Sequence, residues 1–120
     1  MPETGFMEHA GTERANDLAC CEEMARVFRA LGNPTRLGIL RRIVSGEMCV
    51  SELQDRLDRS QPNISQHLGV LRDRGVVVSE RDGTRVSYRP AHPRLGELLE
   101  LAAEIFEIEH SPERPTGGQD

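Results

Sequence analysis

The segment from Val50 to Tyr88 constrains the fold more than any other part of this chain. A short helical pattern over 50–57 is followed by Ser60, which can cap a new helix, and by Pro62 in the first turn of that helix. Apolar residues then recur at helical spacing until Gly75, at Ile64, Leu68 and Leu71. The segment therefore begins as helix, short turn, helix.

A hairpin is predicted directly after the second of these helices. Strand-like runs at 76–81 and 84–89 flank Asp82-Gly83, a dipeptide typical of tight hairpin turns. A two-residue turn at that point places Glu80 opposite Arg85 and leaves Arg81 and Arg85 at the tip. A hairpin in this position is a wing, so the predicted fold class is mainly α with a β-hairpin wing, a winged helix-turn-helix.

Two longer helical patterns, over 15–31 and 93–109, enclose this segment, and each carries an apolar stripe at steps of three and four residues. Asn33 caps a further helix between them, with Pro34 in its first turn. Aromatic residues make up only 3% of the 120 residues, and little is left to cover the last stripe. We expect a homodimer that shares the two flanking helices. The alternative is that the last stripe packs within its own chain.

The predicted domain covers residues 15–110, with disordered tails at 1–14 and 111–120, the second of which contains Pro112 and Pro115. No apolar run approaches the roughly 20 residues needed to span a bilayer. The polar start lacks the apolar core of a signal peptide. We therefore predict a cytoplasmic protein with reduced cysteines.

The charge of the chain is unevenly distributed. The whole chain carries a net charge of −5, but the span from Arg56 to Arg94 holds eight arginines against four acidic residues, a net of +4. A basic patch confined to one module indicates a surface for nucleic acid. No glycine-rich phosphate loop, nucleophile elbow or paired acid–base motif is present, so the sequence does not indicate an enzyme.

Five segments follow one another along the chain: Phe28–Leu40, Ser51–Leu53, Ser60–Leu71, Gly75–Val77 and the Asp-Gly-Thr-Arg wing tip at 82–85. In this order and spacing they resemble the ArsR/SmtB family of winged-helix repressors, which sense metals and metalloids. The resemblance spans roughly Met24 to Phe106. It implies a homodimer that sits on double-stranded operator DNA with an inverted repeat and leaves it when an inducer binds.

The first turns of the helix that begins after Ser60 present hydroxyl and amide side chains, which can read base edges in the major groove. Wing arginines can reach the backbone or the minor groove beside it. The predicted DNA contacts are Ser60, Gln61, Asn63, Ser65, Gln66, His67, Arg81 and Arg85. A solvated helix face is the alternative for the polar residues.

The chain has three cysteines, of which Cys20 and Cys21 are adjacent and Cys49 stands alone. If the short helix starts at Val50, Cys49 is its N-cap and Glu52 completes a capping box. The positive end of a helix favours a thiolate, the form that binds metal. An alternative start places Ser51 at the cap, with Cys49 outside the helix.

Three sulfur ligands suit As(III) or Sb(III), and we predict that Cys20, Cys21 and Cys49 bind one of these as inducer. Soft thiolates also suit Cd(II), Pb(II), Hg(II) or Cu(I). A thiol redox or persulfide switch and a structural role for all three cysteines are further alternatives. Many arsenic sensors of the resembling family carry Cys-x-Cys where this chain has Cys49-Val50-Ser51. The resemblance to members with an N-terminal Cys-Cys pair implies ligands from both subunits, and the last helix lacks the family's zinc-binding patterns.

Overall fold

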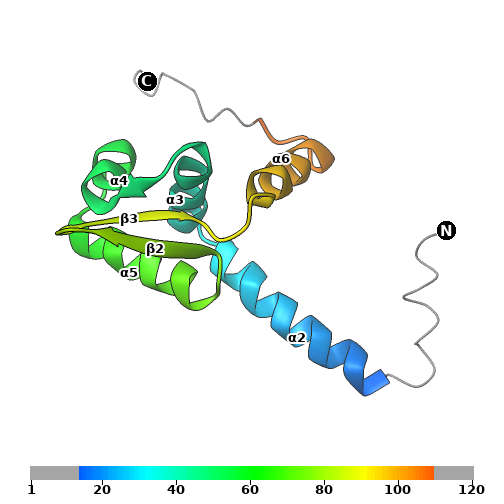
Figure 1. Ribbon diagram of the computed structural model, residues 1–120. Coiled ribbons are helices and arrows are strands. Elements are labelled where there is room, and N and C mark those ends of the chain that lie inside the picture. The colour runs from blue at the N-terminus through cyan, green and yellow to red at the C-terminus, as the bar shows by residue number, and fades with distance from the viewer. Residues whose placement is uncertain (1–13, 110–120) are drawn as a thin grey trace.

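The computed structural model describes residues 14–109, which form five helices and a small sheet (Figure 1). The elements are α2 (Arg14–Leu31), α3 (Pro34–Ser45), β1 (Met48–Cys49), α4 (Val50–Leu57), α5 (Gln61–Asp73), β2 (Val77–Asp82), β3 (Arg85–Pro90) and α6 (Leu95–Ile105). The predicted winged helix-turn-helix is thereby confirmed. Most of both predicted tails, 1–13 and 111–120, lies outside the described residues, as does His110.

The core lies where α3, α4 and α5 meet the sheet. Its fully buried side chains are Ile39, Leu40, Ile43, Leu53, Ile64, Leu68, Leu71 and Val77. These are the apolar positions that recur at three- and four-residue steps in the three helices, joined by the first residue of β2. Burial of one such side chain contributes about 1.5–3 kcal/mol.

Side-chain caps fix where α3 and α5 begin. The Asn33 carboxamide oxygen accepts the Arg36 N–H at 3.0 Å, and the Ser60 hydroxyl accepts the Asn63 N–H at 3.2 Å. Each helix also has proline in its first turn, where a missing N–H leaves nothing unsatisfied. The start of α5 is therefore set by local sequence.

The wing differs in register from the expectation. Asp82 pairs with Arg85, so the two-residue loop is Gly83-Thr84, and Glu80 lies opposite Ser87 rather than Arg85. Gly83 has φ +70°, and glycine tolerates this at the first loop position. The shift is two residues, an even number, so each side chain keeps its predicted face of the sheet.

A third strand, β1, was not predicted. It is only two residues long, and it pairs with β3 through Met48–Tyr88 and Cys49–Ser87, giving the strand order β1-β3-β2. The wing is therefore hydrogen-bonded to the segment that carries Cys49.

Helices α2 and α6 leave much of their apolar surface uncovered. Helix α2 extends away from the rest of the chain, and α6 lies beside α3 (Figure 1). The exposed large apolar side chains on and just after these helices are Leu18, Met24, Phe28, Leu98, Leu101, Ile105, Phe106 and Ile108. The alternative in which the last stripe is buried in its own chain is wrong for Ile105 and Phe106. No helix among the described residues is both long and apolar enough to cross a membrane.

Candidate nucleic-acid interface and thiol site

The first turn of α5 presents polar groups in a defined arrangement. Ser60 and Gln61 are exposed, and the Gln61 amide donates to the Ser65 hydroxyl at 2.8 Å, one helical turn further on. Gln66 is also exposed. Amide and hydroxyl groups on one helix face can donate to and accept from base edges.

Three of the predicted contacts are less accessible than expected. Asn63, Ser65 and His67 are half-buried, and the Asn63 carboxamide oxygen is buried without a hydrogen-bond partner among the described residues. Of the six predicted contacts from this helix, only Ser60, Gln61 and Gln66 are therefore classed as exposed. A half-buried side chain can offer only part of its polar surface to DNA.

His67 is held by Arg36 from α3. An Arg36 guanidinium N–H lies 3.2 Å from His67 Nδ1, which accepts in the neutral ring. Burial, together with the positive charges of Arg36 and Arg59, lowers the pKa of His67. The same guanidinium donates to the carbonyls of Ala30 at 2.6 Å and Arg29 at 3.3 Å, so it joins the end of α2 to α5.

The two wing arginines lie close to the loop, and both are exposed. Arg85 makes an ion pair of 3.5 Å with Glu52 in the first turn of α4, and Arg81 has no partner among the described residues. Arg81 is therefore the more readily available cation for a phosphate, whereas contact by Arg85 competes with Glu52.

Cys49 is the N-cap of α4, as the first of the two alternatives predicted. Only 8% of the residue is exposed, because it also belongs to β1 and is covered by the neighbouring sheet and helix. Its sulfur lies 3.2 Å from the Ser51 hydroxyl. A ligand for Cys49 must therefore displace or enter packing at the edge of the wing.

Glu52 connects this cysteine to the wing. Its carboxylate accepts the Cys49 backbone N–H at 2.9 Å and pairs with Arg85. The Cys49 backbone N–H, then the Cys49 thiol, and more weakly Arg85 and Arg56, lower the pKa of Glu52. A change in the charge or position of the thiol is thus felt by the carboxylate that holds Arg85.

The other two cysteines lie elsewhere. Cys20 and Cys21 are exposed on α2, which extends away from the sheet and α4 (Figure 1). Within residues 14–109, no three His, Cys, Asp or Glu side chains are grouped as a metal site would require. A single protomer therefore does not bring the three predicted sulfur ligands together.

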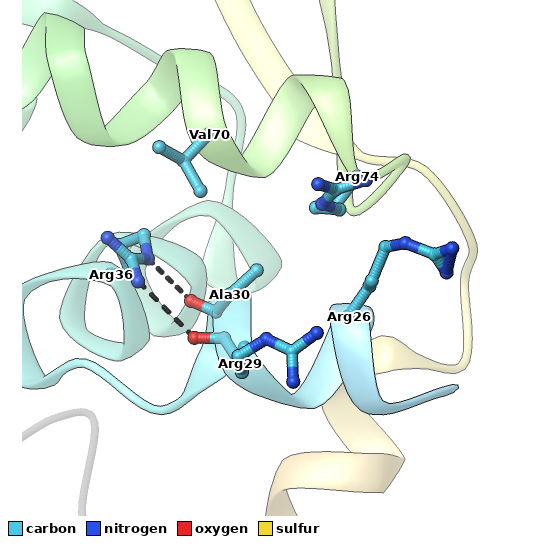
Figure 2. A pocket seen from close by; sticks show the side chains of 6 residues that line it. All are labelled: Arg26, Arg29, Ala30, Arg36, Val70 and Arg74. Carbon is cyan, nitrogen blue, oxygen red and sulfur yellow. Dashed lines mark hydrogen bonds between the residues drawn. The ribbon is translucent and has the colours of Figure 1, made fainter. Parts of the chain in front are cut away.

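A basic hollow that the sequence did not predict lies between α2 and α5. It has a volume of about 390 Å³ and is lined by Arg26, Arg29, Ala30, Arg36, Val70 and Arg74 (Figure 2). The predicted basic patch started at Arg56, so it excluded three of these four arginines. No local signal joins them, because they come from three different helices or their ends.

Known proteins resemble most of this chain. An uncharacterized HTH-type transcriptional regulator of Methanocaldococcus jannaschii is 39% identical over 70% of this chain and 96% of its own length. A probable mercury resistance operon repressor of Streptomyces lividans is 39% identical over 78% of this chain and 76% of its own. A homodimeric winged helix-turn-helix domain from Mycobacterium bovis, described as a possible ArsR-family regulator, superposes with a TM-score of 0.70 at 32% identity, over 83% and 96% of the two chains.

The helix-turn-helix, with the exposed start of its second helix and the following wing, defines a winged helix-turn-helix DNA-binding domain. The family described as a helix-turn-helix domain matches residues 31–80, which span α3 to β2. The chain belongs to the ArsR/SmtB family of winged-helix transcriptional regulators.

Proposed function

We propose that this chain is a cytoplasmic, homodimeric repressor that binds an inverted-repeat operator and releases it when As(III) or Sb(III) binds Cys20, Cys21 and Cys49. The start of α5 reads the major groove, and the wing arginines hold the backbone beside it. The repressors among its relatives support the direction of the response.

The uncovered faces of α2 and α6 support a homodimer. Phe28 on α2 is 55% exposed and Phe106 after α6 is 70% exposed, which a monomer in water would not favour. The similar domain from Mycobacterium bovis is described as homodimeric. Pairing α2 and α6 about a two-fold axis buries these side chains in both copies.

The observation that carries the sensing proposal is the connection from Cys49 to the wing. Cys49 pairs with Ser87 in β3, and Glu52 joins the Cys49 N–H to the Arg85 guanidinium. A ligand on the Cys49 sulfur therefore acts on a residue that is linked to the wing in two ways, by strand pairing with Ser87 and through Glu52 to Arg85. Coupling between inducer and DNA therefore needs no long route through the protein.

The three sulfur atoms fit a soft ion only across two protomers. The Cys20–Cys21 pair lies on α2, the helix whose apolar face needs a partner, so a dimer can bring the pair toward Cys49 of the partner subunit. A soft trivalent metalloid supplies a centre that prefers thiolate ligands. The chain itself contributes three thiols and, through α2, a dimer contact.

The proposal is tested with the full-length protein and DNA from its own promoter region. As(III) should release wild-type protein from the DNA, and Cys49→Ser should keep DNA affinity while losing the release. The control adds Ser111→Cys to the Cys49→Ser variant, which restores the number of thiols at another position. This double variant should not recover the response to As(III). A Cys49→Ser protein that still responds fully removes Cys49 from the site.

Two alternatives use the same residues. The mercury-linked relative favours Hg(II), or another soft divalent ion such as Cd(II) or Pb(II), as inducer. The exposure of Cys20 and Cys21 favours a thiol redox or persulfide switch. Release by As(III) under strong reductant supports metalloid sensing, and release by oxidant or sulfane sulfur alone supports the redox switch.

A further inference from the structure

The basic hollow between α2 and α5 contains positive charge that belongs neither to the polar start of α5 nor to the thiol site. Four of its six lining residues are arginines, and none is acidic. Figure 2 shows Arg26, Arg29 and Arg74 around the space between the end of α2 and α5, with Arg36 beside them. Several guanidinium groups around one opening repel each other unless an anion lies among them.

The hydrogen bonds of these arginines separate their roles. Arg36 is occupied by the Ala30 and Arg29 carbonyls and by His67, and Arg26 donates to the Glu22 carbonyl at 3.2 Å. Among the described residues, the side chains of Arg29 and Arg74 have no hydrogen-bond or ion-pair partner. Arg29 and Arg74 are therefore the side chains available to a ligand.

Helix polarity alone does not account for this cluster. Helices α2 and α5 both end near the hollow, and cations near helix C-termini are favourable. Arg36 fulfils that role, because it bonds the last carbonyls of α2. The guanidinium groups of Arg29 and Arg74 bond no carbonyl among residues 14–109, so they do not cap these ends.

The hollow lies further along the side of α5 that carries Gln66, one of the residues proposed to contact bases. Val70 and Arg74 follow Gln66 at steps of four residues, so all three lie along one side of α5 and its end. Arg74 is about 12 Å beyond Gln66 along the helix axis, at 1.5 Å per residue. When the first turns of α5 read bases, the end of the helix is well placed for the phosphates that border the groove.

We propose that Arg29 and Arg74, flanked by Arg26 and Arg36, bind a phosphate oxyanion. Planar guanidinium groups match the oxygens of phosphate, and two unpaired forks from different helices can bind it from two sides. The phosphate belongs either to the DNA backbone or to a free anion in solution. Only the first source rests on the proposed function.

The first test measures binding of full-length protein to a 30-base-pair duplex of arbitrary sequence by fluorescence anisotropy at several salt concentrations. Arg74→Ala should weaken binding and reduce the slope of log K against log salt by about two, because each protomer of a dimer loses one phosphate contact. Arg94→Ala removes equal charge from a side chain that pairs with Glu97 outside the hollow, and should leave the slope within about 0.5 of wild type.

The second test replaces DNA with inorganic phosphate at constant ionic strength, with chloride as the reference. NMR signals of the arginine side-chain N–H groups should shift saturably in wild type and not in Arg74→Ala, if the hollow takes a free anion. Thermal unfolding in chloride establishes that both variants fold, as expected for substitutions of exposed side chains.

The outcomes separate the possibilities. A slope change confined to Arg74→Ala identifies the DNA backbone as the source. An unchanged slope with saturable phosphate binding that Arg74→Ala abolishes identifies a free anion. The absence of both effects overturns the hollow as a phosphate site. If wild-type protein binds no DNA at all, the proposed function fails, and the phosphate titration alone decides the hollow.

Discussion

Replacing Phe28 with alanine should weaken the dimer by an amount that the structure allows us to calculate. Full burial of a phenylalanine side chain contributes about 1.5–3 kcal/mol, and 55% of this residue is exposed in the single chain. Burying the remaining half in a partner is therefore worth about 1–1.5 kcal/mol per copy. A two-fold interface contains the residue twice, which gives about 2–3 kcal/mol, or roughly 30- to 150-fold in the dissociation constant.

Sedimentation velocity across a range of protein concentrations measures this constant directly. Val86→Ala, at a half-buried position in β3 on the wing, is the matched control and should leave dimerisation unchanged. An unchanged constant for Phe28→Ala excludes this side chain from the interface. Wild-type protein that stays monomeric at micromolar concentration would refute the homodimer and, with it, the shared thiol site.

Two further predictions concern α5. Ser60→Ala removes the acceptor for the Asn63 N–H and should lower the free energy of unfolding by about 1 kcal/mol, measured by urea denaturation at fixed protein concentration, whereas Ser79→Ala at an exposed position of β2 should change it by less than about 0.5 kcal/mol. Equal effects would show that the cap contributes nothing. His67 has a lowered native pKa, so the unfolded state binds more protons below about pH 6.5, and stability should fall as pH drops from there toward the native pKa. His67→Gln keeps an acceptor for Arg36 without titrating, and should flatten the dependence of unfolding free energy on pH between about 7 and 5; an unchanged slope contradicts the argument.

Local chemistry explains why most of the fold could be predicted. Asn33 and Ser60 cap the helices they precede, with proline following in each first turn, so these starts depend on a few adjacent residues. The sequence does not determine the strand register of the wing, because Asp82-Gly83 is compatible with a loop at those two residues and with a loop that begins at the glycine. Both choices place Val77 on the same face of the sheet, because the two registers differ by an even number of residues.

The site depends on contacts that no sequence period encodes. Arg36 and His67 are 31 positions apart in the sequence. The ion pair of Glu52 and Arg85 joins α4 to β3, which are close in space but not adjacent in the sequence. Helical spacing predicts which residues share a face of one helix, but not which faces of two helices meet. For that reason the polar face of α5 was predicted, whereas its half-buried members and the basic hollow were not.

The hydrogen bonds from Arg36 to the end of α2 have a geometric consequence for a dimer that binds DNA with two copies of α5. An 18-residue helix is about 27 Å long, so a 10° change in its angle moves the far end by roughly 5 Å. Successive major grooves on one side of the duplex repeat about every 34 Å, and a mismatch of that size puts one head out of phase with its groove. The hydrogen bonds of the Arg36 guanidinium to the end of α2 and to α5 thus help to set the distance between the two copies of α5 in a dimer.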